Sequence, residues 1–154
     1  MFVRDRFEKE YRDVFNEYKY GSTIWSPLAG GILAGKYNDG VVPEGSRYDN
    51  FSAMLDSTWQ KYMGPEKKDV TCAKLRALAE LAKSLGFTQA QLALAWSIAN
   101  KDVSTCILGF TRLEQVSENL VAIDLYKIWT PAIEKSVRDI LKNEPEAVMD
   151  FRSW

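Results

Sequence analysis

Histidine is absent from the 154-residue chain. Its absence excludes a histidine general base and the common zinc sites in which imidazole is a ligand. A serine–histidine–aspartate set is excluded for the same reason. The carboxylates are spread over predicted helix faces and show no metal-ligand spacing. The residues alone therefore indicate binding without catalysis.

Cysteine is scarce as well. Cys72 and Cys106 are the only two, and they do not form a CxxC pair. No secretory signal is visible, because the first twenty residues are heavily charged. We expect both cysteines to be reduced core thiols of a cytoplasmic protein.

Long apolar runs and an excess of charge of one sign are missing too. The apolar stretches are short and interrupted by polar residues, which excludes insertion into a bilayer. The formal net charge is −1, so no chain-wide positive field would attract nucleic acid or an anionic membrane. The length and the 46% of hydrophobic residues predict one globular domain with a core.

The first part of the chain predicts a helix, a strand and a long connection. Residues 4–19 have the pattern of an amphipathic helix, whose apolar face would consist of Phe7, Tyr11, Phe15 and Tyr18. Residues 22–26 predict a short buried strand that ends before a proline. The glycine-rich LAGGILAGKY follows. The irregular stretch 38–66 then has the length of a lid or binding loop, with a short helix around Phe51 to Met63.

The second part is more regular. Residues 66–85 predict a helix whose core positions are Val70, Leu75, Leu78, Leu81 and Ala82. Two capping boxes, Thr88 with Gln91 and Thr111 with Glu114, predict helices over 89–100 and 112–123. Between them, residues 103–108 predict a second buried strand. Thr130 and Pro131 open a last helix that extends to about Asn143.

Strands that alternate with helices predict an α/β fold with parallel pairing. Two strands are too few for a closed barrel or an ordinary open sheet. We therefore expect part of the fold to lie outside this chain.

The second strand leads into a segment suited to anion binding. Gly109 permits a tight turn, and the free N–H groups of a helix capped by Thr111 would form an anion site. Arg112 either lies beside a phosphate or points to solvent. Gln115, Glu118 and Asn119 share one helix face, which either contacts a nucleobase and ribose or is an ordinary solvated surface.

The first strand ends in a similar segment. Trp25 offers an aromatic face, although a tryptophan is more often part of a core. The turn after it supplies a hydroxyl and exposed backbone, and it consists of Ser26, Pro27, Leu28, Ala29 and Gly30. Lys36 and Arg47 lie on either side of the start of the loop. They either fold over a pyrophosphate or are solvated surface charges.

Together, WSPLAGGILAGKY, Arg47, TQAQLALAW and ILGFTRLEQVSENL resemble the aldo-keto reductase superfamily. Within it, the chain is most similar to the cytoplasmic beta subunits of voltage-gated potassium channels and their microbial relatives. The most specific features are WSPLAGG and the pattern G-x-T-x-x-x-Q-x-x-E-N at 109–119. The similarity extends over nearly the whole chain.

The resemblance implies a (β/α)8 TIM barrel that binds NADPH without a Rossmann domain. Residues 1–154 would be a partial domain that begins after the sixth strand and supplies the last two strand-helix units plus the C-terminal helices. The loops after strands seven and eight of such barrels commonly form a phosphate site. By resemblance, Trp25 through Gly30 would line the nicotinamide and pyrophosphate, and Lys36 and Arg47 would close over the phosphates. Residues 38–66, which begin just after Lys36, would form the cofactor lid. The adenosine end would be held by Gly109, Thr111, Gln115, Glu118 and Asn119, with Arg112 as a candidate for the 2′-phosphate.

The chain departs from the family pattern at three points. Gly30 stands where the channel subunits usually have cysteine, and one extra residue lies between Gly40 and Arg47. The catalytic aspartate, tyrosine, lysine and histidine of the family belong to the first half of the barrel and match nothing here. We therefore expect the isolated chain to reduce no carbonyl substrate, because hydride transfer needs a proton donor beside the carbonyl.

Three functions are consistent with these observations. The chain is part of a reductase of aldehydes and ketones, a redox-sensing regulatory subunit of a potassium channel, or a non-catalytic remnant. The expected partners are NADPH and either a complementary N-terminal barrel half or a second copy, because two strands leave apolar helix faces uncovered. No nucleic acid and no membrane insertion are expected.

Overall fold

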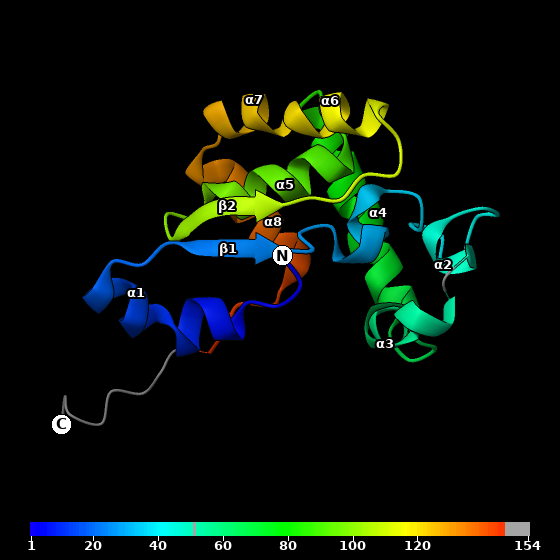
Figure 1. Cartoon of the computed structure of the whole chain (residues 1–154), viewed down its shortest axis with the longest axis horizontal. Coiled ribbons are helices and arrows are strands. Elements are labelled where there is room, and N and C mark those ends of the chain that lie inside the picture. The colour runs from blue at the N-terminus through cyan, green and yellow to red at the C-terminus, as the bar shows by residue number, and fades with distance from the viewer. Residues whose placement is uncertain (51, 147–154) are drawn as a thin grey trace.

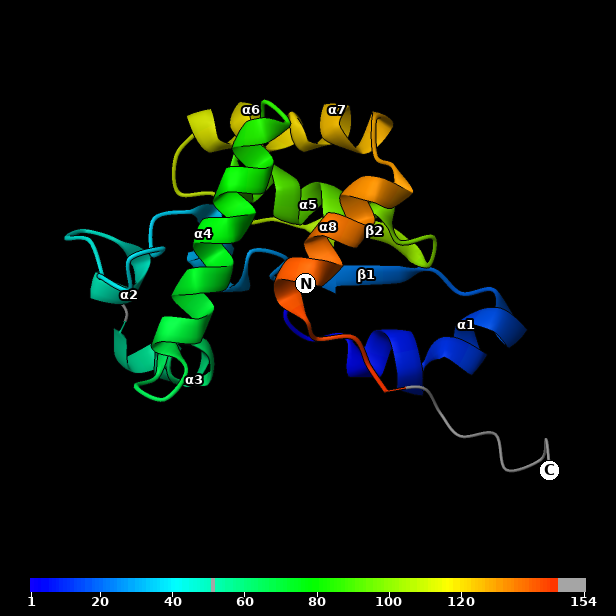
Figure 2. The ribbon, with the colours of Figure 1, turned by 180° about the vertical axis from the view of Figure 1, so that it is seen from behind.

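Two parallel strands lie at the centre of the computed structural model, which describes residues 1–50 and 52–146. Strand β1 spans Ser22–Trp25 and β2 spans Val103–Ile107, and the register pairs Thr23 with Thr105 and Trp25 with Ile107. The predicted parallel pairing is thus confirmed. Helices lie behind the two strands in Figure 1 and in front of them in Figure 2.

Helix α5, Gln89–Ala99, is the centre of the helical layer. It begins at the predicted capping box, in which the Thr88 hydroxyl accepts a hydrogen bond from the Gln91 N–H and the Gln91 side chain accepts one from the Thr88 N–H. It packs against β2 and against helices α4 (Lys68–Ser84), α6 (Glu114–Leu120) and α7 (Ala122–Lys127). Contacts on several sides explain why α5 is apolar nearly all round.

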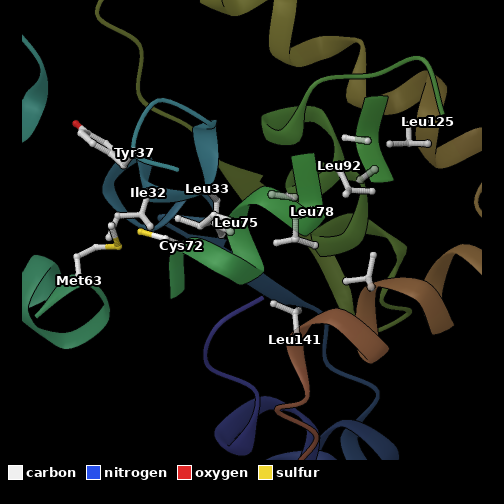
Figure 3. Packing of buried hydrophobic residues seen from close by; sticks show 14 of the residues in the cluster. Ile32, Leu33, Tyr37, Met63, Cys72, Leu75, Leu78, Leu92, Leu125 and Leu141 are labelled. Atoms are coloured by element: carbon white, nitrogen blue, oxygen red, sulfur yellow. The ribbon is translucent and has the colours of Figure 1, made fainter. Parts of the chain in front are cut away.

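The hydrophobic core is built from the helices and the segments between them, and none of its buried members comes from β1 or β2 (Figure 3). It joins α4, α5 and α7 to the 3₁₀ helix η2, Ala29–Ala34, and to α8, Pro131–Leu141. The fully buried members include Ile32, Leu33, Leu75, Leu92, Leu125 and Leu141. The core therefore fixes the start of the long connection directly after β1.

The opposite face of the strands is open, and the prediction of two buried strands is wrong in this respect. Trp25 is 81% exposed and its partner Ile107 is 57% exposed. Side chains alternate between the two faces of a strand, and α5 covers one face only. Within the described part of the chain, no element covers the other face (Figure 1).

The first helix is interrupted. A π-helical segment η1, Asp5–Glu10, precedes α1, Arg12–Tyr18. The Tyr11 N–H donates to the Arg6 carbonyl, a bond across five residues that breaks the 3.6-residue period. Phe15 is buried as predicted, but Tyr11 and Tyr18 are exposed, so the predicted apolar face is wrong at these two positions.

Two other helix predictions need correction, and the helix predicted within the long connection is confirmed. Val70 is 60% exposed, and Cys72 takes the buried position on that part of α4. The single helix predicted over 112–123 is divided into α6 and α7, and Thr111 does not cap it. The short helix predicted around Phe51 to Met63 is confirmed as α3 (Ser52–Met63), although Phe51 itself lies outside the described residues, and the connection also contains α2 (Arg47–Asn50), which was not predicted.

The C-terminal helix and the cysteines agree more closely with expectation. Helix α8 begins at Pro131, with the Thr130 hydroxyl accepting a hydrogen bond from the Ile133 N–H, and ends at Leu141, slightly earlier than predicted. Cys72 and Cys106 are both free thiols; Cys72 is buried and Cys106 is half-buried.

No helix in the described ranges is long and apolar enough to cross a membrane.

Candidate functional site

The predicted site residues lie in two segments that leave adjacent strands at the same end. Because β1 and β2 are parallel and pair Trp25 with Ile107, the residues after each strand start from one edge of the sheet. In Figure 1 the chain passes from β1 into η2 and from β2 into the loop before α6 at this edge. The carboxyl ends of parallel strands are the usual location of ligand sites in α/β folds.

The first segment, residues 26–31, has unusual backbone geometry; we call it the glycine turn. Ser26 and Ala29 have φ angles of 54° and 49°, and Gly30 and Gly31 have 67° and 98°. The left-handed conformation costs a non-glycine residue roughly 1–2 kcal/mol. Hydrogen bonds from Ala29 N–H to Ser26 C=O and from Gly31 N–H to Leu28 C=O hold the turn. Ser26 is exposed beside Trp25, while Pro27 is buried.

Lys36 and Arg47 belong to the connection that follows the glycine turn. The Lys36 ammonium lies 5.2 Å from the centre of the Tyr37 ring, and a Cβ at Gly31 would lie 3.6 Å from Lys36 Cε. Arg47 begins α2 and is exposed. Both cations are therefore solvent-accessible and are carried by the same connection.

Tyr48, which the sequence analysis missed, fastens α2 to the glycine turn. It is 3% exposed, and its hydroxyl donates to the Ala29 carbonyl at 3.4 Å. Its ring packs against Tyr37 and Trp59 with centroid distances of 5.3 and 4.8 Å, and Tyr37 and Trp59 are 5.4 Å apart. We call these three residues the lid aromatic cluster. The connection has no hydrophobic period, so no sequence signal identified Tyr48.

Burial raises the pKa of Tyr48 from 10.0 to about 12, and the neighbouring Tyr37 contributes to the rise. The folded state thus holds this proton more tightly than the unfolded chain does. The free energy of unfolding should be unaffected by this group below pH 10 and should fall as the pH rises from 10 toward 12.

We expect Tyr48→Phe to remove this part of the alkaline destabilisation. Urea unfolding of both proteins at several pH values below and above 10 measures the difference. Identical pH dependence of the two proteins would show that Tyr48 titrates normally.

In the second segment, residues 109–119, the side chain of Gln115 accepts the backbone hydrogen bonds at the start of the helix, in place of the predicted capping box. The Gln115 side-chain oxygen accepts from the Thr111 N–H at 3.0 Å, the Thr111 hydroxyl at 3.4 Å and the Arg112 N–H at 3.4 Å. Leu113 occupies the N-cap of α6 without a side-chain hydrogen bond. Gln115 competes successfully because its amide reaches both N–H groups at once, so the prediction that Thr111 and Glu114 form a capping box is wrong.

The polar face of α6 is only partly available. Gln115 is folded back onto the loop, Glu118 is exposed, and Asn119 is half-buried. The Gln91 amide donates to the Glu118 carbonyl at 2.7 Å, so the glutamine of the α5 capping box also holds α6. Gly109 and Arg112 are exposed, and a Cβ at Gly109 would meet nothing within 4 Å.

Side-chain contacts thus join some of the predicted residues but not all. The lid aromatic cluster contacts the glycine turn through Tyr48 and Lys36 through Tyr37, whereas Arg47 is linked to it only as the residue before Tyr48 in α2. The side-chain hydrogen bonds of residues 109–119 go to that segment itself and to α5. The two segments share an edge of the sheet but are otherwise separate.

A cavity of about 430 Å³ lies elsewhere, at the opposite end of the strands. It is lined by residues that include Trp96, Asn100, Trp129 and Glu134. Asn100 lies just before the amino end of β2, so this cavity does not coincide with the segments described above. Within residues 1–50 and 52–146, no group of three or more histidine, cysteine, aspartate or glutamate side chains could hold a metal ion.

Residues 1–135 match the sequence profile of the Aldo/keto reductase family. The chain belongs to this family. The match includes both strands, the glycine turn and residues 109–119. The resemblance deduced from the sequence motifs is therefore confirmed at the level of the family.

Relatives named as voltage-gated potassium channel beta subunits are similar over nearly the whole chain. A protein of Schizosaccharomyces pombe is 42% identical over 143 residues, which is 93% of this chain and 40% of that protein. One of Arabidopsis thaliana is 34% identical over 154 residues, which is 99% of this chain and 44% of that protein. The chain thus spans less than half the length of these relatives.

Proposed function

We propose that the chain forms the carboxyl-terminal part of a (β/α)8 barrel, with β1 and β2 as its last two strands. Support comes from the single covered face of the sheet. In a closed barrel, helices cover the outside and the inward side chains fill the interior. Trp25 and Ile107 would then face the interior, which explains their exposure in this chain. The proposed partner is the complementary barrel half, or a second copy of the chain.

The proposed function is to supply the NADPH-binding part of an aldo-keto reductase that reduces aldehydes or ketones when complete. The observation that carries it is the departure of the glycine turn and of residues 109–119 from adjacent parallel strands at one edge. The cofactor itself would supply the hydride. We place residues 1–154 in one partial domain of a cytoplasmic protein, with residues 38–66 as the cofactor lid.

The arrangement of donors fits an anionic cofactor. Two backbone N–H groups and the Thr111 hydroxyl converge on one acceptor, the Gln115 side-chain oxygen, as they would on a phosphate oxygen. Arg112 is exposed beside them. Rotation of Gln115 would free these donors and turn its amide toward the adenosine.

Each proposed binding residue has a role that follows from its position. Trp25 presents an uncovered ring for stacking on the nicotinamide side, next to the Ser26 hydroxyl. Arg47 in the lid and Lys36 just before it neutralise the pyrophosphate, and Arg112 neutralises the 2′-phosphate. The remaining contacts would be made by Pro27, Leu28, Ala29 and Gly30 on one side and by Gly109, Thr111, Gln115, Glu118 and Asn119 on the other.

A second candidate function is that of a regulatory subunit which senses redox state through bound NADPH. It is favoured by the relatives of 42% and 34% identity, which are named as potassium channel beta subunits. Both functions require the same cofactor site. They differ in whether a complete barrel turns over carbonyl substrate.

Cofactor binding by the purified chain tests the proposal. We expect NADPH to quench tryptophan fluorescence saturably and more strongly than NADH, because Arg112 favours the 2′-phosphate. Trp25→Phe should remove most of the quenching. Trp129→Phe is the matched control, since Trp129 lines the cavity at the other end of the strands. Absence of saturable quenching, or equal responses to both nucleotides, would contradict the proposal and favour a remnant.

A further inference from the structure

Gly30 and Tyr48 are 18 positions apart in sequence, but the Tyr48 hydroxyl lies next to the place where a side chain at position 30 would begin. A Cβ added at Gly30 would lie 2.5 Å from the Tyr48 hydroxyl oxygen and 3.3 Å from Tyr48 Cζ. Real Cβ atoms do not approach other atoms as closely as the first distance. Tyr48 is 3% exposed and is packed between Tyr37 and Trp59, so it has little room to move away.

We propose that Tyr48 is a positioning residue that seats the lid on the glycine turn, and that glycine at position 30 is required to admit its hydroxyl. The hydrogen bond to the Ala29 carbonyl ties α2 to the turn, and the lid aromatic cluster ties it to the residue after Lys36. The effect of this contact on nucleotide binding rests on the cofactor site proposed above. The contact between the lid and the glycine turn is independent of that site.

Seating the lid in this way positions Arg47, which belongs to the lid, and Lys36, which lies just before it. Arg47 immediately precedes Tyr48 in α2, so the direction of its side chain depends on how α2 is held. Lys36 lies over the ring of Tyr37, which meets Tyr48 edge-on. Loosening Tyr48 would therefore release both positive charges from the edge of the glycine turn and weaken the attraction for an anionic ligand.

Gly31 provides the matched control. Its φ of 98° would strain any other residue there, but the nearest atom to an added Cβ is Lys36 Cε at 3.6 Å, an ordinary contact. Gly31→Ala therefore introduces backbone strain without a collision. Gly30→Ala introduces backbone strain together with a collision that depends on the Tyr48 hydroxyl.

The test is a double-mutant cycle between Gly30→Ala and Tyr48→Phe, read out by the rate of tryptic cleavage in the lid at Arg47 and Lys61. Cleavage follows the population of the open lid when opening is fast. We expect Gly30→Ala to accelerate cleavage about tenfold with tyrosine at 48 and about twofold with phenylalanine, since overpacking is relieved when the hydroxyl is removed. Gly31→Ala should give the same factor in both backgrounds. Equal effects of Gly30→Ala in both backgrounds would overturn the proposal.

NADPH titration of the same four proteins separates this proposal from the cofactor site. If both are right, Gly30→Ala weakens NADPH binding more with tyrosine at 48 than with phenylalanine. If the parent chain binds no NADPH but the cleavage rates are coupled, the cofactor site fails and the role of Tyr48 stands. If NADPH binds but the cleavage rates are independent, the role of Tyr48 fails and the cofactor site stands.

Discussion

Leu75→Ala is expected to lower the free energy of unfolding by about 2–5 kcal/mol, the range for large-to-small changes in a close-packed core. Leu75 is completely buried in α4 and belongs to the cluster that joins η2, α4, α5, α7 and α8 (Figure 3). Truncating it removes apolar contacts and leaves a cavity that these elements cannot close independently. Urea unfolding followed by circular dichroism measures the change.

Val70→Ala, in the same helix, is the control. Val70 is 60% exposed, so its truncation should change stability by no more than about 0.5 kcal/mol. The pair separates loss of core packing from any change in helix propensity. Equal effects of the two substitutions would mean that α4 is not packed against this core.

Glu8→Gln is expected to destabilise the fold by about 3 kcal/mol, because it leaves the Arg4 guanidinium buried without a counter-charge. Arg4 is 2% exposed and makes two short hydrogen bonds to Glu8, at 2.7 and 2.6 Å. Its guanidinium also lies 5.9 Å from the centre of the Trp96 ring. The loss falls at the lower end of the range for buried pairs because the Glu8 side chain is 22% exposed.

Two controls show whether the uncompensated charge is the cause. The double variant Arg4→Met with Glu8→Gln removes both charges and should recover most of the lost stability. Asp139→Asn breaks the exposed pair with Lys135 and should cost no more than about 1 kcal/mol. If the double variant is as unstable as Glu8→Gln, the loss of stability comes from altered packing around Arg4 and not from an uncompensated charge.

The features that the sequence predicted correctly depend on neighbours in the chain. The Thr88–Gln91 capping box and the start of α8 at Thr130-Pro131 are local, because each cap is satisfied within three residues. The parallel pairing followed from the alternation of strands with helices. The family was identifiable because each of its motifs lies within a short stretch of sequence.

The features that the sequence did not predict depend on contacts between residues that are not neighbours in the chain. The strands that contain Trp25 and Ile107 were predicted to be buried, but burial requires a covering layer, and α5 covers the other face. Thr111 had the right spacing for a cap, yet Gln115 reaches the same N–H groups from within the helix. Tyr48 reaches Ala29 across 19 residues of an aperiodic connection. Local patterns contain no information on such contacts.

The most direct test of the proposed cofactor site is nuclear magnetic resonance mapping of the ¹⁵N-labelled chain titrated with NADP⁺. We predict that the perturbed amide signals belong to the glycine turn, Lys36, Arg47 and residues 109–119, and that the signals of Trp96, Asn100 and Trp129 around the cavity do not move. Saturable changes confined to that set would place the nucleotide at the carboxyl ends of β1 and β2. Changes centred on the Trp96–Trp129 cavity, or none at all, would contradict the proposed site.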